Sequence, residues 1–122
     1  MFGMAAVATL TLTTLATSSA CADDGTAHEY TIYCAKCHGE DGRGNGVYAV
    51  KLHKQPRDFT DCVTMAKIPD VTIIKVIEEG GEAVGLSNEM PSWQGALDDD
   101  EIAALAKYVR GFCVKPPGTP QP

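Results

Sequence analysis

The chain has 122 residues and a formal net charge of -6 at pH 7, a length that fits a single domain. The acidic balance argues against nucleic acid as a partner and predicts a soluble, acidic surface. A domain of roughly 100 residues has a modest core by surface-to-volume scaling, so a large buried apolar group would add much of the missing interior.

Residues 1–22 have the composition of an export signal, because an apolar, threonine-rich segment is followed by small residues that end at Ala22. This pattern predicts cleavage after Ala22, with Ala20 as an alternative, and export to the periplasm. The apolar segment is shorter than the roughly 20 residues of a membrane span, so we expect no stable span. Lipid anchoring through Cys21 is less favoured, because Ser18 stands where lipoprotein sites usually carry a branched apolar residue.

Two cysteines and a histidine come together in the stretch Cys34-Ala35-Lys36-Cys37-His38. If residues 30–38 are helical, both thiols lie on one face of the helix, where they can reach the two vinyl groups of one porphyrin. His38 follows directly, and a neutral imidazole is a common metal ligand. The pattern C-x-x-C-H is typical of c-type haem attachment. Cys34 and Cys37 are therefore predicted to hold a haem covalently and His38 to bind its iron.

A C-x-x-C pair also occurs in thioredoxin-like redox sites and in zinc sites. A zinc site needs a second Cys or His pair at short spacing, but Cys62 and Cys113 are single and far apart in the sequence. A thioredoxin-like site needs a preceding strand and a parallel sheet, and the sequence predicts neither. Haem attachment is the favoured interpretation.

The glycine-rich residues 39–46 follow the motif. A phosphate-binding loop is not favoured, because no Gly-Lys-Ser/Thr follows and no strand precedes. Glycine permits positive φ and close approach, which we expect at the porphyrin edge. Residues 47–52 predict a short helical turn, and residues 55–59 predict a loop anchored by Phe59. Arg57 is either a partner of a haem propionate or a solvated surface residue.

The stretch from residue 69 to residue 81 carries conflicting signals. Its β-branched residues favour a strand, whereas Pro69 at the start and Gly80-Gly81 at the end are typical of helix termini. Ile73 and Ile77 form an apolar stripe at helical spacing. A helix is predicted.

A methionine in an apolar neighbourhood is usually a core residue, which is the expectation for Met4 and Met65. Met90 differs because Pro91 disfavours a helical conformation at that position. A loop between two helices would then present the thioether to the iron from the side opposite His38. We predict Met90 as the sixth ligand of the iron.

Residues 98–113 have the clearest helical periodicity, with apolar residues at i, i+3, i+4, i+7 and i+11. Asp98 with Glu101 resembles a capping box at the start of this helix. Three prolines make residues 116–122 a Pro-rich tail, for which no helix is predicted.

Cys62 and Cys113 are left over from the haem motif. In an exported protein two such cysteines suggest a disulfide, which would stabilise the fold by about 4 kcal/mol in the chain-entropy model. Two separate buried thiols are the alternative. His28 and His53 are less favoured substitutes for the iron ligands, because isolated histidines are more often surface residues.

Taken together, these segments resemble the bacterial-type class I (mono-haem) c-type cytochromes. The matching segments cover nearly all of residues 26–113; they are Tyr30-x-x-x-Cys34-x-x-Cys37-His38-Gly39, Gly42-Arg43-Gly44-Asn45-Gly46, Pro56-Arg57-Asp58-Phe59-Thr60, Gly80-Gly81-Glu82-Ala83-Val84-Gly85, Met90-Pro91-Ser92-Trp93 and Tyr108-Val109-Arg110. The resemblance implies an all-α, small cytochrome c fold of three to five helices around one haem c, in a domain over residues 23–115.

The resemblance also implies roles for individual residues. Cys34 and Cys37 would hold the haem, His38 would be the proximal iron ligand and Met90 the distal one. Aromatic residues would support this site, with Tyr30 and Tyr108 packed near the crossing of the first and last helices and Trp93 close to a propionate.

Ligation by both His38 and Met90 would saturate the iron and leave no open position for a substrate. The sequence therefore predicts a soluble periplasmic one-electron carrier and no enzyme activity, with redox partner proteins that present a basic docking face. One alternative is a haem enzyme or ligand sensor with a displaceable Met90. Another is a cytochrome subunit of a larger respiratory complex.

Overall fold

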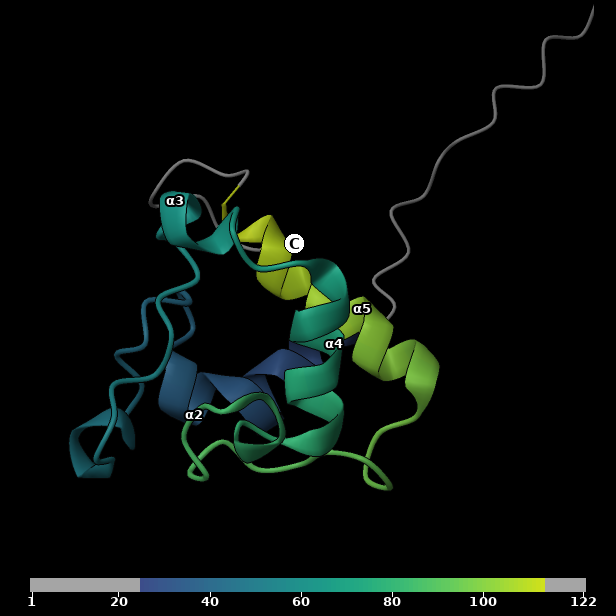
Figure 1. The fold of residues 1–122 in the computed structure, drawn as a ribbon, viewed down its shortest axis with the longest axis horizontal. Helices are drawn as coiled ribbons and strands as arrows, with labels where there is room; N and C mark the ends of the chain where they lie inside the picture. Colours follow the sequence, from purple (N-terminus) through teal and green to yellow (C-terminus); the bar gives the residue numbers. More distant parts are fainter. Residues whose placement is uncertain (1–24, 114–122) are drawn as a thin grey trace, which may run out of the picture.

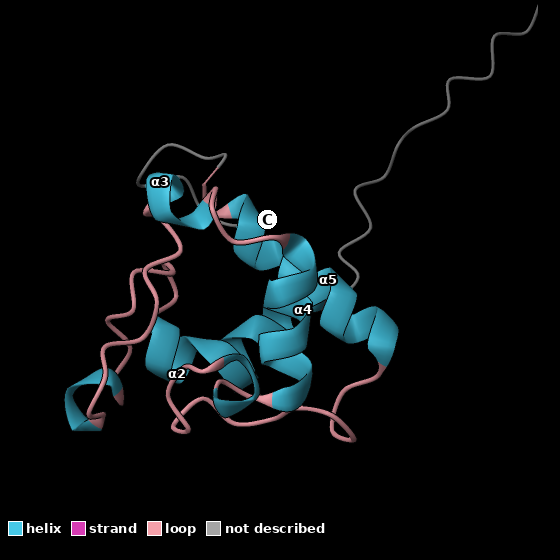
Figure 2. Ribbon diagram, viewed as in Figure 1, coloured by secondary structure: helices cyan, strands magenta, loops and turns pink. Residues whose placement is uncertain are grey.

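The computed structural model describes residues 25–113. The predicted export signal, Met4, Cys21 and the Pro-rich tail lie outside these residues. Within them the regular elements are all helical (Figure 2), which confirms the prediction of an all-α fold. None of the helices between residues 25 and 113 is long and apolar enough to span a membrane.

The first helical region consists of three consecutive pieces: α1 (Thr26–Glu29), the π-helical segment η1 (Tyr30–Cys34) and α2 (Ala35–His38). The expectation of one regular helix over residues 30–38 is therefore corrected. A π-helical turn holds more residues than an α-helical turn, so the spacing across η1 departs from regular α-helical geometry, whereas Cys34 is the N-cap of α2 and Cys37 lies within it. Cys34 is buried and Cys37 is half-buried.

The predicted helix over residues 69–81 is confirmed as α4 (Asp70–Glu79), with Pro69 at its N-cap. Its apolar stripe is buried, since Ile73 is 8% exposed and Ile77 is 5% exposed. The helix ends at Gly80, whose φ of 87° is a conformation that side-chain-bearing residues rarely adopt. Burial of the stripe and the glycine terminus together outweigh the strand preference of the β-branched residues.

The last helix, α5 (Asp99–Gly111), begins with the predicted capping box. Asp98 accepts the Glu101 amide at 2.9 Å, and the Glu101 carboxylate accepts the Asp98 amide at 2.7 Å. Short helices complete the described fold; they are η2 (Ala49–Lys51), α3 (Cys62–Met65) and η3 (Glu82–Val84). The helical turn predicted over residues 47–52 corresponds to η2.

The core lies where α1 and α4 pack against α5 (Figure 1). Tyr30 is 1% exposed there, and its ring lies 5.0 Å from Tyr108 and 5.3 Å from Phe112. The Tyr30 hydroxyl donates to the Gly39 carbonyl at 2.8 Å. Burial raises the pKa of Tyr30, so the ring stays neutral. Tyr30 and Tyr108 thus pack where the first and last helical regions meet, as the resemblance implies, and Met65 is a core residue at 2% exposure.

Arg110 ties α5 to the connection between α3 and α4. Its guanidinium donates to the carbonyls of Met65 and Ile68, both at 2.6 Å, and to the Asp70 carboxylate at 2.6 and 2.9 Å. The Arg110 side chain is 29% exposed, whereas the Asp70 side chain is 76% exposed. The carbonyl contacts therefore lie in the less solvated part of this network.

Replacing Arg110 with alanine is expected to lower the free energy of unfolding by about 2–3 kcal/mol, because hydrogen bonds from a charged donor to partly buried carbonyls are lost. Asp70→Asn is the matched control and should cost less than about 1 kcal/mol, since its ion pair is solvated. Urea unfolding of both variants measures the difference. An equal loss in both variants would show that the ion pair, and not the carbonyl contacts, stabilises this junction.

Candidate functional site

His38 is the last residue of α2 and is held from two sides. Its Nδ1 lies 3.2 Å from the carbonyl oxygen of Arg57, and its ring stacks on Phe59 with centroids 4.5 Å apart and an interplanar angle of 14°. Burial lowers the pKa of His38, which favours the neutral imidazole. When Nδ1 carries the proton and donates it to the carbonyl, Nε2 keeps a free lone pair for a metal.

The cysteines of the motif are both free thiols. Burial raises the pKa of Cys34 to about 12, with a smaller contribution from Cys37. Burial also raises the pKa of Cys37. Both sulfurs are reduced, and neither is consumed in a bond to the other. This is the state that addition of a thiol to a vinyl group requires.

The glycine-rich loop packs against the motif itself. The amide of Gly44 donates to the His38 carbonyl at 2.7 Å, and the amide of Gly46 donates to the Cys37 carbonyl at 3.1 Å. A Cβ atom at Gly46 would overlap the carbonyl oxygens of Lys36 and Ala35. The close backbone approach expected for this loop is thus made to α2, where it satisfies carbonyls at the C-terminus of the helix.

Gly46→Ala is expected to destabilise the protein by about 1–3 kcal/mol, because the added methyl group meets backbone that must move. Gly111→Ala is the matched control, since a Cβ atom there has no neighbour within 4 Å. That change should be neutral or stabilise α5 by up to about 1 kcal/mol. Thermal unfolding compares the two variants, and equal stability of both would contradict the close contact at Gly46.

Met90 lies half-buried in the loop between η3 and α5. Its carbonyl accepts the Gly81 amide at 2.9 Å. Further along the loop, the Trp93 amide donates to the Ile77 carbonyl at 3.0 Å, and the Trp93 ring lies 5.0 Å from that of Tyr33. The loop therefore runs beside both α4 and the helical region that carries the cysteines (Figure 1).

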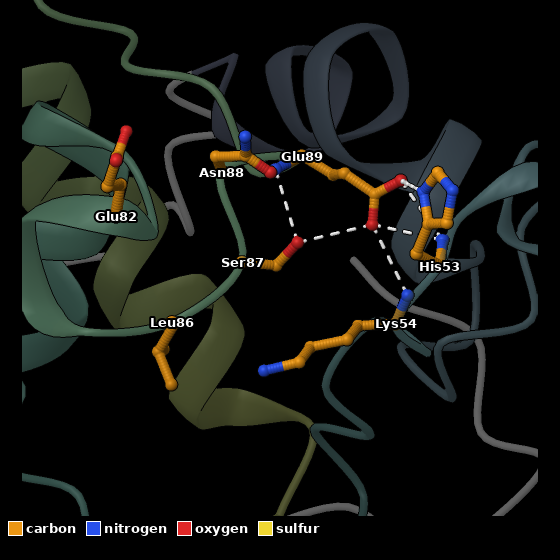
Figure 3. Close-up of a pocket in the computed structure, with 7 residues that line it drawn as sticks. All are labelled: His53, Lys54, Glu82, Leu86, Ser87, Asn88 and Glu89. Carbon is orange, nitrogen blue, oxygen red and sulfur yellow. Dashed lines mark hydrogen bonds and ion pairs between the residues drawn. The ribbon is translucent and has the colours of Figure 1, made fainter.

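Glu89, directly before Met90, joins this loop to residues 53 and 54 (Figure 3). Its carboxylate accepts the backbone amides of His53 at 3.0 Å and Lys54 at 3.2 Å, and the Ser87 hydroxyl at 3.2 Å. These hydrogen bonds, led by those from His53, lower the pKa of Glu89 to about 2. The carboxylate is thus a fixed anion between two loops, beside an open pocket that both loops line.

Other residues from the sequence analysis are not brought to His38 by their side chains. His28 is exposed on α1, and His53 is exposed with its Nδ1 2.9 Å from Glu89. The Arg57 side chain is also exposed. Arg57 contacts His38 through its backbone carbonyl. Sequence reasoning missed this carbonyl and the role of Glu89. The position of Glu89 directly before Met90 was the one feature of the sequence that could have pointed to its role.

The donor set fits a covalently attached haem. The neutral imidazole, the two reduced thiols and the loop thioether are the donors that thioether attachment and axial iron ligation use. Their positions differ in rigidity, because three of them lie at or next to α2 and Met90 lies on a loop held by backbone hydrogen bonds.

Comparison with known proteins gives a consistent result. Residues 22–109 match the family model described as cytochrome C oxidase, cbb3-type, subunit III. The chain is 32% identical over 79 residues to the cbb3-type cytochrome c oxidase subunit FixP of Bradyrhizobium diazoefficiens, a match that covers 65% of this chain and 23% of FixP. The chain thus spans about a quarter of that relative's length.

Shorter relatives also match. Cytochrome c6 of Chlorolobion braunii is 36% identical over 76 residues, covering 62% of this chain and 74% of that protein. Among solved structures, the KustC0563 c-type cytochrome is 32% identical with a TM-score of 0.59, covering 71% of this chain and 95% of that one.

Proposed function

Because the chain belongs to the class I c-type cytochromes, which carry covalently bound haem c with iron, we propose that it is an exported one-electron carrier with His38 and Met90 as iron ligands. The observation that carries this proposal is the fixed imidazole of His38. Its Nδ1 is engaged by the Arg57 carbonyl at 3.2 Å, so Nε2 is the nitrogen left for the metal.

The chain's own residues divide the work of holding the cofactor. Cys34 and Cys37 would form the two thioether links and hold the porphyrin beside the helix that ends at His38. Phe59 stacks on the imidazole and restricts its rotation. When bound, haem supplies a one-electron ferrous–ferric couple, and the protein buries it and sets its potential.

Met90 is proposed as the second iron ligand, because it lies in the segment Met90-Pro91-Ser92-Trp93 that resembles the cytochrome family and on a loop held by backbone hydrogen bonds. The loop that bears it is held to α4 by the Trp93 amide, which donates to the Ile77 carbonyl, and to the segment after α4 by the Gly81 amide, which donates to the Met90 carbonyl. A thioether ligand raises the reduction potential and occupies the site that a substrate would need. Both consequences favour a carrier over an enzyme or a gas sensor.

The proposed setting is the periplasm, where the carrier exchanges electrons with partner proteins. The net charge of -6 favours partners with a basic docking face, with association that weakens as salt rises. The match to FixP supports a second candidate, a cytochrome subunit of a larger oxidase complex. Gel filtration of the native extract distinguishes the two, since a free carrier elutes near the mass of one small domain.

The central test uses protein matured in a host that attaches haem. Optical spectra of both oxidation states and intact-mass measurement should show one covalently bound haem, and carbon monoxide should bind the reduced protein slowly. Colourless protein would refute the haem assignment. Coloured protein that binds carbon monoxide rapidly would keep the haem and refute Met90 ligation in favour of the enzyme or sensor alternative.

A further inference from the structure

Cys62 and Cys113 lie far apart in the sequence and next to each other in the fold. Cys62 begins α3, and Cys113 follows the end of α5. The Cys62 thiol donates to the Cys113 carbonyl at 3.4 Å, while the Cys113 thiol donates to the Phe59 carbonyl at 3.1 Å. Each sulfur thus reaches into the segment that carries the other cysteine.

We propose that Cys62 and Cys113 are an oxidative modification site, at which a disulfide joins the segment after Phe59 to the end of α5. The proposal is independent of haem ligation, because neither cysteine belongs to the C-x-x-C-H motif. In an oxidising compartment, a pair of neighbouring thiols is converted to a disulfide when a suitable acceptor is present.

The two thiols differ in access, which assigns an order to the reaction. Both are free thiols in the structure, where Cys62 is exposed and Cys113 is half-buried. Burial and the neighbouring Cys62 thiol raise the pKa of Cys113 to about 11. Because its side chain is exposed, Cys62 is the group that attacks first. The co-reactant is a protein or small molecule that carries an exchangeable disulfide.

The exchange balances in two displacements. The Cys62 thiolate attacks the donor disulfide, forms a mixed disulfide and releases one donor thiolate. The Cys113 thiolate then attacks the Cys62 sulfur and expels the second donor sulfur. In total the pair loses two protons and two electrons, and the donor becomes a dithiol.

The bridge would stabilise a segment that contacts His38. Phe59 stacks on the His38 ring, and the Phe59 carbonyl accepts the Cys113 thiol. A covalent link between Cys62 and Cys113 makes the connection between this segment and α5 independent of that hydrogen bond. The imidazole is then supported by a segment whose distance from α5 is fixed by covalent geometry.

The test is a peptide map of the exported holoprotein, alkylated in denaturant without reductant. Trypsin should release residues 58–67, which contain Cys62, joined to the peptide that begins at Gly111. The joined species should disappear after reduction. Two separately alkylated peptides would overturn the proposal. The same map reads the state of Cys34 and Cys37, so failure of haem attachment is seen separately.

A second measurement tests the mechanical consequence. Cleavage of the Cys62–Cys113 disulfide in the wild-type holoprotein should lower the unfolding temperature by about 10 °C or more relative to the wild type with the disulfide intact. The double substitution Cys62→Ser with Cys113→Ser should lower it by a similar amount. The reduced wild type needs no mutation, so a folding defect of the serine variant does not decide the outcome. Equal unfolding temperatures before and after reduction would overturn the proposed stabilisation.

Discussion

Met90→Ala is expected to leave the haem attached while lowering its reduction potential and opening the iron to external ligands. The thioether stabilises the reduced state, and its removal should shift the potential by a sizeable part of the roughly 0.8 V range over which axial ligands act. Carbon monoxide should then bind the reduced variant rapidly. Potentiometric titration and stopped-flow carbon monoxide binding measure the two effects.

Met65→Ala is the matched control for this experiment. Met65 is 2% exposed in the hydrophobic core, so its truncation should cost about 2–5 kcal/mol of stability and leave the potential and the carbon monoxide rate nearly unchanged. The two methionines thus separate ligation from packing. A wild-type spectrum in the Met90 variant would refute the proposed ligation.

Replacing both Cys34 and Cys37 by alanine is expected to abolish covalent haem attachment completely. No other cysteine stands beside His38 in the sequence to form the thioethers. After acidic organic extraction, the variant should lose all its haem to the solvent while the wild type keeps it. Intact mass should confirm a chain without the haem increment.

The control is the Cys62→Ser, Cys113→Ser variant, which removes the same number of thiols away from the motif. It should retain covalent haem in full, even where its unfolding temperature is lower. Haem that remains covalently bound in the Cys34, Cys37 variant would contradict the assignment of these residues as the attachment site.

Much of the fold could be predicted where the signal lies in local sequence. Asp98 and Glu101 define the start of α5 because both partners of a capping box stand within one turn. Gly80 ends α4 because it adopts a positive φ that other residues rarely adopt. Ile73 and Ile77 are spaced so that both face the core on one side of the helix. The helix could be favoured over the strand because Pro69 at its start, Gly80 at its end and the spacing of Ile73 and Ile77 agree.

The remainder depends on contacts that side-chain identity does not encode. The segment η1 (Tyr30–Cys34) is π-helical, although its sequence is typical of an ordinary α-helix. The partner of His38 is a backbone carbonyl. Because every residue has one, the identity of the Arg57 side chain does not predict this contact. Glu89 acts across 36 residues of sequence, a pairing that no local pattern reveals.

The carboxylate of Glu89 has one more effect. It accepts amides from both His53 and Lys54, so departure of the Met90 loop from this side of the domain leaves those two amide protons without their acceptor. Their exchange with deuterated solvent therefore reports on fluctuations of a methionine more than 30 positions away in the chain. The single carboxylate thus couples opening of the Met90 loop to exposure of the His53 and Lys54 amides.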